Sequence, residues 1–408
     1  MSLITYKFRL YPNNEQTTMI NKTFGCVRFI YNKILADAKQ TYEETGKSIF
    51  YQPTRYKKEF EWLKEVDSVA LCYARLNLRT AYSNFFAKRS AEPTFKKKTD
   101  HNDSYQTLSA SNAIRIINDR IRLPKIGIVK FIKHRNIEEG KIKTVTVSRK
   151  PSGRYYVSIL VDSFEDKDYT LPKTGKSVGI DLGIHHFATL SDGTKIENPR
   201  MLERYLERLA ILQQRVSSKE KGSNNREKAR RKLAKMYEHI ANYKKDFFDK
   251  LTYDLVKNHD KIVIEDLDVK SMLLDDSSNR KMQHNINRSI ATVGFYNFRV
   301  MLDYKCKKYG KELIVANKYE ATSQKCSCCG YKNTLVKDLK VRMWQCPECG
   351  AIHDRDVNAA KNLLSLVEDK VSLQGYVDPS ANEIKESILP SEERKQIIEK
   401  HKNLGLSL

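Results

Sequence analysis

Two CxxC pairs form the clearest chemical pattern in the sequence. Their cysteines are Cys326, Cys329, Cys346 and Cys349, and a glycine follows each pair. Two such knuckles can hold four thiolates around one tetrahedral ion, and glycine permits the tight turn of each knuckle. The spacing predicts one structural Zn²⁺ with no coordination position left for water. A redox-active CxxC is the alternative, which two pairs at this spacing disfavour.

Carboxylates at the ends of apolar segments form a second chemical pattern. Asp181 and Glu265 each end an apolar, strand-like run, whereas Asp354 and Asp356 stand where a helix of small residues begins. Burying an isolated carboxylate is costly, and convergence on divalent cations would explain three of these acids. Such ligands suit Mg²⁺, with Mn²⁺ as a substitute, and two ions about 4 Å apart can support phosphodiester hydrolysis.

Each acid taken alone also has an ordinary explanation. Asp181 could cap a turn, Glu265 could pair with a lysine, and Asp356 could be a helix N-cap. The segment Gly179–Gly183 could also be a phosphate loop of an actin-like ATPase, although the sequence offers no convincing second loop of that kind.

Periodicity predicts the elements that must carry these residues. Ile4–Leu10 alternates as a half-buried strand does, and Asn13 with Gln16 predicts a capping box that begins a helix. A second helix is expected over Val69–Ala87. Short strands separated by turn signals between residues 104 and 162 indicate a small barrel or curved sheet.

Strands and helices interleave after residue 176, which indicates an α/β sheet. The expected elements are a hairpin of Ser177–Asp181 and His186–Leu190, helices over Pro199–Val216, Asn225–Asn258 and Ile290–Tyr309, and strands over Lys261–Glu265 and Glu312–Ala316. Of the remaining cysteines, Cys26, Cys72 and Cys306 are expected to be buried in helices. Cys328 lies between two ligands and is not expected to bind the metal.

The chain is strongly basic, with 74 Lys+Arg against 50 Asp+Glu in 408 residues and a net charge of +24. This excess favours a polyanionic partner, with nucleic acid ahead of an anionic membrane surface. It is uneven: Pro199–Lys250 has a net charge of +8, whereas the segment from Val367 on is slightly acidic and is expected to be a mobile tail with a short helix over Ser391–Lys402. No apolar run approaches the ~20 residues of a membrane span, and the N-terminus is unlike a secretory signal, so no membrane partner and a cytoplasmic location are expected.

Motifs along residues 3–366 resemble those of the TnpB family, RNA-guided nucleases of insertion sequences that are long described as transposases and are related to type V CRISPR effectors. The motifs follow one another in the family's order: Lys7-x-Arg9-Leu10-Tyr11-Pro12-Asn13 with Gln16, Phe24-Gly25, Arg28-Phe29-x-Tyr31-Asn32, Ala81-Tyr82-x-Asn84-Phe85-Phe86, Pro93-x-Phe95-Lys96-x-Lys98, Gly179-Ile180-Asp181-Leu182-Gly183, Ile264-Glu265-Asp266-Leu267, Thr322-Ser323-Gln324, Trp344-x-Cys346-Pro347-x-Cys349-Gly350 and Asp354-Arg355-Asp356-x-Asn358-Ala359-Ala360.

The resemblance implies a mixed α/β multidomain fold. A β-barrel wedge carries a helical recognition insertion, and an RNase H-like (RuvC) nuclease domain with an inserted zinc ribbon follows. The implied boundaries are 1–10 and 102–172 for the wedge, 11–101 for the helical insertion, 173–320 and 352–366 for the nuclease domain with a basic helical insertion at 199–258, 321–351 for the zinc ribbon and 367–408 for the tail.

Carried over by position, the resemblance makes Asp181, Glu265 and Asp356 the catalytic, Mg²⁺-binding acids. Asp356 is preferred to Asp354 because the matching acid stands two residues before the asparagine. The implied activity is Mg²⁺-dependent cleavage of double-stranded DNA beside a short motif, in a prokaryotic cytoplasm or nucleoid. The implied partners are a guide RNA from the element's end and a target DNA, with the protein a monomer on its RNA. The expected nucleic-acid contacts are Tyr51, Lys96, Lys97, Lys98 and Arg355.

The sequence departs from the family pattern in two places. Asp246–Lys250 lacks the family's common histidine, and Cys72 replaces a typical glutamine, so no adjacent-motif preference can be borrowed. Two rival functions stay open: a transposase that uses the same acids for strand transfer, and an RNA-guided DNA-binding repressor without cleavage. The intact acids disfavour the repressor.

Overall fold

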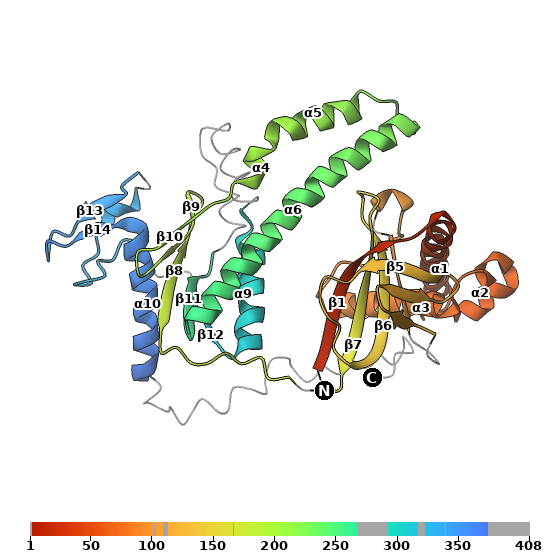
Figure 1. The fold of residues 1–408 in the computed structure, drawn as a ribbon, viewed down its shortest axis with the longest axis horizontal. Coiled ribbons are helices and arrows are strands. Elements are labelled where there is room, and N and C mark those ends of the chain that lie inside the picture. Colours follow the sequence, from red (N-terminus) through yellow and green to blue (C-terminus); the bar gives the residue numbers. More distant parts are fainter. Residues whose placement is uncertain are drawn as a thin grey trace. The chain divides into compact units, whose positions relative to one another are not determined.

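The computed structural model describes residues 2–101, 103–108, 113–165, 167–267, 293–316, 323–338 and 340–373. The chain divides into two compact units, the first built from Met1–Lys167 and the second beginning at Asp168. Figure 1 colours the first unit from red to yellow and the second from yellow-green to blue. The helix expected over Ser391–Lys402 lies outside the described residues, as does the beginning of the helix expected over Ile290–Tyr309.

A seven-stranded antiparallel sheet is the framework of the first unit, in the order β2-β6-β7-β1-β5-β4-β3. The predicted N-terminal strand lies in its middle, with Tyr6, Phe8 and Leu10 buried. The resemblance implied a barrel, and the described strands form a half-barrel sheet. The strands are β1 (Ser2–Tyr11), β2 (Asp103–Leu108), β3 (Arg115–Ile117), β4 (Arg120–Leu123), β5 (Gly127–Ile132), β6 (Gly140–Arg149) and β7 (Tyr155–Ser163).

Helices cover the apolar face of this sheet, and their buried side chains join those of the strands in one core. The predicted capping box begins the first helix: Asn13 Oδ1 accepts from the backbone N–H of Gln16 at 2.8 Å, and Gln16 Oε1 accepts from that of Asn13 at 3.1 Å. Gln16 also donates to the Ile128 carbonyl of β5 at 2.7 Å, which fixes the helix start on the sheet. The helices are α1 (Asn14–Thr45), α2 (Pro53–Glu59), η1 (Glu61–Lys64), α3 (Ser68–Phe86) and η2 (Lys98–Asp100).

A buried carboxylate ties α1 to the sheet. Asp103 on β2, whose side chain is 5% exposed, lies between the guanidinium groups of Arg28 on α1 and Arg149 on β6. The distance from Arg28 Nη1 to Asp103 Oδ1 is 3.1 Å, and Arg149 also donates to Asn21 Oδ1 at 3.0 Å. The burial is tolerated because two cationic donors compensate the charge.

Removing this carboxylate should destabilise the protein, because it leaves two arginines close together without their counter-charge. We expect Asp103→Ala to lower the free energy of unfolding by about 3 kcal/mol in urea denaturation of the full chain. Asp119→Ala is the matched control, because Asp119 is half exposed and its ion pairs are 3.9 Å long; a change within about 0.5 kcal/mol is expected there. Equal losses in the two variants would contradict the role given to Asp103.

The second unit is built on a mixed five-stranded sheet of order β10-β9-β8-β11-β12. β8, β9 and β10 are antiparallel neighbours, whereas β8, β11 and β12 run parallel. This confirms the strands predicted after residue 176 and their α/β arrangement. The strands are β8 (Ser177–Leu182), β9 (His186–Leu190), β10 (Lys195–Glu197), β11 (Lys261–Glu265) and β12 (Glu312–Ala316).

Helices cover both faces of this sheet, with α6 and α9 on one side and α10 on the other (Figure 1). Val178, Ile180 and Ile264 face α6 (Asn224–Asn258) and α9 (Phe295–Tyr309). The residues that alternate with them therefore face α10 (Arg355–Leu373), which packs there through Leu363. The α10 helix continues past residue 366, into the segment predicted to be tail.

The basic segment forms a helical hairpin, close to the two helices predicted there. α4 (Met201–Arg204) and α5 (Leu206–Ser217) precede α6, and Gln213 donates to the hydroxyl of Tyr237 at 2.8 Å across the hairpin. The segment between β12 and α10 holds η4 (Thr334–Lys337), β13 (Met343–Gln345) and β14 (Ile352–Asp354). Among the helices of the described residues, none is apolar over a length that could cross a bilayer.

The prediction that three helical cysteines are buried is correct for two of them. Cys26 and Cys306 are buried, but Cys72 is exposed. The core face of α3 contains Ala70, Leu71 and Ala74, so Cys72 lies on the opposite face. The helical pattern predicted the helix correctly and assigned this small residue to the wrong face.

Candidate active site and metal centre

Two of the predicted acids lie at the same edge of the second sheet. In the parallel pair of β8 and β11, Ile180 is the register partner of Ile264. Asp181 and Glu265 are the next residues of these strands, so they lie side by side at the carboxyl ends. Both alternate with core residues of the α6 and α9 face, and both therefore belong to the face that α10 covers.

Close packing of α10 on β8 brings the third acid to the same place. A Cβ at Gly179 would overlap the carbonyl oxygen of Ala360 and lie 2.7 Å from the backbone nitrogen of Leu364. Gly179 and Asp181 share one face of β8, and Ala360 and Asp356 are one helical turn apart on α10. The backbone contact at Gly179 therefore sets Asp356 opposite Asp181.

The charges of Glu265 and Asp356 affect the ionisation of Asp181. The pKa of Asp181 is raised well above its ordinary value, first because the carboxyl is removed from water, and then because the charges of Glu265 and Asp356 oppose its ionisation. Arg355 and Arg342 act in the opposite direction. Because a divalent cation would relieve this repulsion and prefers carboxylate oxygens, the donor set fits the Mg²⁺ expected from the sequence.

The two neighbouring aspartates at the start of α10 have different surroundings. Asp354 is the N-cap: its Oδ1 accepts from the N–H groups of Asp356 and Val357, both at 3.1 Å, and its Oδ2 lies 2.7 Å from Lys195 Nζ. Desolvation opposes ionisation of Asp354, but the hydrogen bonds from Lys195 and Val357 lower its pKa. Asp356 instead lies 3.5 Å from Arg342 Nη1. The N-cap explanation considered for Asp356 is therefore wrong, and Asp354 has that role.

Adding a methyl group at Gly179 should separate α10 from the sheet. We expect Gly179→Ala to lower the free energy of unfolding by about 2 kcal/mol, since the overlap is with backbone atoms that cannot rotate away. Urea denaturation would measure it. Gly25→Ala is the matched control, because that glycine lies inside α1 with no atom within 4 Å of a new Cβ, and a neutral or stabilising change is expected. An unaffected Gly179→Ala would show that α10 is not held at this contact.

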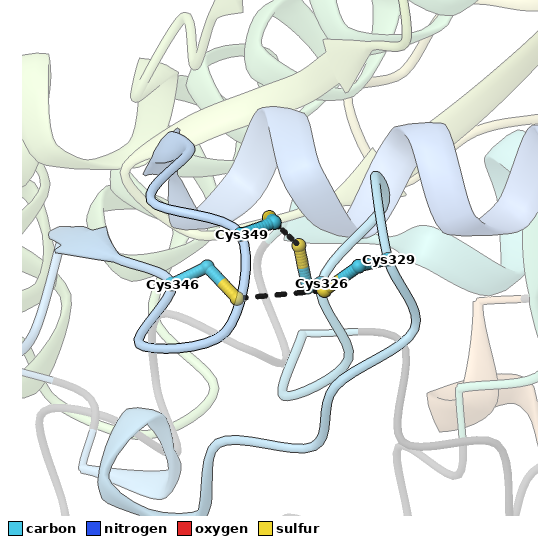
Figure 2. A group of neighbouring side chains, drawn as sticks. All are labelled: Cys326, Cys329, Cys346 and Cys349. Carbon is cyan, nitrogen blue, oxygen red and sulfur yellow. Dashed lines mark hydrogen bonds between the residues drawn. The ribbon is translucent and has the colours of Figure 1, made fainter.

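The four predicted cysteines meet at one point (Figure 2). The Sγ atoms of Cys326 and Cys349 are 3.7 Å apart, and those of Cys329 and Cys346 are 3.6 Å apart. Zn–S bonds of about 2.3 Å in a tetrahedron require sulfur separations of about 3.8 Å. The arrangement thus fits a Zn²⁺ ion held by four thiolates.

The two knuckles share the same backbone geometry. Gly330 donates to the Cys326 carbonyl and Gly350 to the Cys346 carbonyl, both at 2.9 Å. These glycines have φ values of +82° and +72°, in the left-handed region where a side chain is strained. The glycine after each CxxC is therefore needed to close the turn around the ion.

The sequence analysis did not single out His353, which contacts this centre. The His353 Nε2 atom lies 3.0 Å from Cys326 Sγ, and the buried ring packs on Trp344 with centroids 4.7 Å apart. Burial opposes ionisation of Cys326, but the N–H groups of Cys329 and Cys328 together with His353 lower its pKa to about 5. His353, Cys326 and Cys328 form a second, smaller group of close ligand atoms. A search for nitrogen donors near the last cysteine would have found it.

Single substitutions should separate the two ligand groups. Cys329→Ser and Cys349→Ser are expected to lose the metal or bind it at least tenfold more weakly, because each removes one of four thiolates. Cys328→Ser should keep one zinc per chain. Metal analysis of the purified chains measures this directly. Zinc lost from Cys328→Ser but retained by Cys349→Ser would instead assign the ion to the group that contains His353.

Among the predicted nucleic-acid residues, three consecutive lysines lie in the segment that leads into η2 of the first unit. The backbone of Lys96 exchanges hydrogen bonds with the side chain of Asn32 on α1, at 2.8 and 2.9 Å, and Lys96 Nζ lies 4.0 Å from the centre of the Tyr31 ring. Lys97 and Lys98 follow and are exposed. Two motifs far apart in the sequence therefore meet here, and this contact holds the basic loop on α1.

The other two candidates have partners within the protein. The Tyr51 ring carries the Arg55 guanidinium 3.9 Å above its centre. Arg355 is buried, and its Nη1 donates to the Asp338 carbonyl at 2.9 Å. Arg355 thus links the start of α10 to the cysteine-containing segment, and its contact with nucleic acid stays a prediction.

Family models match three parts of the chain. Residues 158–275 match OrfB_IS605, described as "Probable transposase", residues 295–363 match a "Cas12f1-like, TNB domain", and residues 1–47 match a "Helix-turn-helix domain". Within residues 2–47 the structure has one strand followed by one long helix.

Relatives match most of the chain. A "Putative RNA-guided DNA endonuclease" of Streptomyces pristinaespiralis is 40% identical over 369 residues, covering 88% of both chains. The "Putative RNA-guided DNA endonuclease InsQ" of Escherichia coli K12 is 34% identical over 380 residues, covering 89% of this chain and 92% of the relative. Among solved structures, a Cas12f1–sgRNA–target DNA complex matches with a TM-score of 0.49 and 14% identity, over 89% of this chain and 98% of that chain.

The family model, the cysteine group and the sheet together define the class of protein. The chain is a mixed α/β protein of the insertion-sequence OrfB type, with a four-cysteine centre beside a group of carboxylates. It belongs to the TnpB family, as its motifs predicted.

Proposed function

We propose that the chain is an RNA-guided DNA endonuclease of a transposable element, which cleaves double-stranded DNA beside a short motif. The observation that supports this proposal is the placement of Asp181 and Glu265 at neighbouring strand ends, with the charges of Glu265 and of Asp356 on α10 contributing to the raised pKa of Asp181. The names of the two relatives support the same activity.

The strand order supports a RuvC-like nuclease core. Numbered along the chain from β8, the sheet has the order 3-2-1-4-5, with the first three strands antiparallel and the last two parallel to strand 1. This is the arrangement expected of an RNase H-like domain. We assign that domain to residues 173–320 and 352–366, the ribbon with one structural Zn²⁺ to 321–351, the wedge to 1–10 and 102–172, and the helical insertion to 11–101.

The carboxylates of Asp181, Glu265 and Asp356 would hold Mg²⁺, which supplies activation of water and stabilisation of the leaving oxygen in phosphodiester hydrolysis. Asp181 and Glu265 are fixed by the register of two parallel strands. Asp356 is fixed by the N-cap of Asp354 and by the packing of α10 at Gly179. Rigid elements thus hold all three donors in place before any ligand binds.

The basic side chains support nucleic acid as the partner of the chain. The segment Pro199–Lys250, which contains α4, α5 and most of α6, has 15 Lys+Arg against 7 Asp+Glu, and its lysines and arginines can follow phosphates without sequence choice. The exposed loop lysines and Tyr51 of the first unit are proposed to contact the guide RNA or target DNA. Base pairing by the guide then selects the target, and the chain acts as a monomer on its RNA.

The test is cleavage by the full chain purified with its RNA. Asp181→Ala and Glu265→Ala should each reduce the cleavage rate about a thousandfold or more while RNA binding is unchanged. Asp192→Ala is the matched control, since Asp192 is an exposed turn acid of the same unit, and its rate should equal that of the unmodified chain. Metal-dependent cleavage retained in both site variants would refute the assignment.

The same assay separates the rival functions. Products in which donor ends are joined to target DNA would show a transposase. Target DNA that is occupied but intact with Mg²⁺ present would show a repressor. Cut target DNA without joining supports the nuclease.

A further inference from the structure

A side-chain clamp joins the first cysteine knuckle to the helix that carries Asp356. The side chain of Asn358 on α10 is buried, with 1% of the residue exposed. Its Oδ1 accepts from the backbone N–H of Ser327 at 2.9 Å, and its Nδ2 donates to the carbonyl of Lys325 at 2.7 Å. Lys325 and Ser327 are the neighbours of Cys326, so one amide grips the chain on both sides of a zinc ligand.

Two further side chains strengthen this connection. Asn362, one turn along the same face of α10, donates to the same Lys325 carbonyl at 2.6 Å. His353, which directly precedes the N-cap Asp354, lies 3.0 Å from the sulfur of Cys326. The knuckle around Cys326 is therefore contacted by residues that precede Asp356 in the sequence and by residues that follow it.

We propose that Asn358 is a positioning residue that couples the zinc centre to the cluster of three acids, through its effect on the position of Asp356. It stands two residues after Asp356 and in the same first turns of α10, so the register of the helix against the knuckle also sets the place of Asp356. Bound zinc fixes the conformation of the knuckle. The hydrogen bonds of Asn358 to the knuckle then fix the start of α10 and with it the position of Asp356. This inference rests on the proposed nuclease function.

The amide is chemically specific for this role. It offers its oxygen as an acceptor to the N–H of Ser327 and its nitrogen as a donor to the carbonyl of Lys325. An aspartate would keep the acceptor and lose the donor, and an alanine would leave the Ser327 N–H buried without this acceptor. The Lys325 carbonyl would keep the hydrogen bond from Asn362, so the knuckle would remain attached to α10 but would lose its register.

The experiment uses the full chain with its RNA and compares Asn358→Ala and Asn358→Asp with two other variants. Asn362→Ala removes one of the two bonds to Lys325, and Asn333→Ala removes an asparagine of the cysteine ribbon whose Oδ1 accepts from Leu335 within that ribbon. For the Asn358 variants we expect about a tenfold or larger rise in the Mg²⁺ concentration for half-maximal cleavage. Zinc content, RNA binding and target binding should be unchanged, and excess Mg²⁺ should restore part of the rate. Asn362→Ala should shift the midpoint less than threefold, and Asn333→Ala not at all.

Hydrogen exchange supplies a readout that does not depend on activity. Amides of residues 355–360 should exchange at least tenfold faster in Asn358→Ala, and also in the unmodified chain after chelation of zinc, with recovery when zinc is restored. Unchanged exchange after chelation would overturn the inference even if the Asn358 variants do not fold. An unchanged Mg²⁺ midpoint in folded Asn358 variants would overturn it as well. An unmodified chain that does not cut DNA would instead refute the proposed function, and the exchange result would still decide the coupling.

Discussion

The contact between the backbones of β8 and α10 is the constraint on which the second unit depends. Gly179 allows the helix to approach closer than a strand residue with a side chain would permit. Asp356 lies one helical turn before this contact on α10, and Asp181 lies two residues after Gly179 on β8. The same helix carries the asparagines that hold the cysteine knuckle. The position of one helix therefore determines the placement of both the carboxylates and the cysteine ribbon.

The two units use buried charge in opposite ways. In the first unit, Asp103 is balanced by Arg28 and Arg149, so its burial fastens a helix to a sheet. In the second unit, Asp181 has two acids near it and its pKa is raised. The first arrangement is complete within the chain. The second places like charges together, and the Mg²⁺ proposed to bind there would balance them, so its strained electrostatics suit chemistry rather than stability.

The sequence was most informative where a local pattern determines the geometry. Alternation in Ile4–Leu10, the capping box at Asn13 and the two CxxC-Gly knuckles each depend on a few adjacent residues, and the structure confirms all three. The carboxylates were recognisable because an acid that ends an apolar strand is unusual. Their mutual placement needed the register of β8 with β11, which is a long-range property.

Other features could not be read from local patterns. Cys72 was assigned to the core because a helical pattern does not say on which face a small residue lies. The Asn358 clamp joins a helix to a backbone segment about thirty residues earlier in the sequence, and no periodicity marks such a bond. The pairing of Asn32 with Lys96 is of the same kind. Each is a side chain that bonds to distant backbone, and sequence spacing alone carries no signal for it.

The order of the acids along the chain has a consequence for biosynthesis. Asp181, Glu265 and Asp356 come from three well-separated segments, and the last of them follows the cysteine ribbon. A chain still on the ribosome lacks the third carboxylate until both knuckles have been translated. A truncated product that ends within the ribbon therefore contains the residues of the sheet and of the basic hairpin but lacks α10 and Asp356. If the three carboxylates act together as proposed, the site can form only in chains that have been translated through the ribbon and into α10.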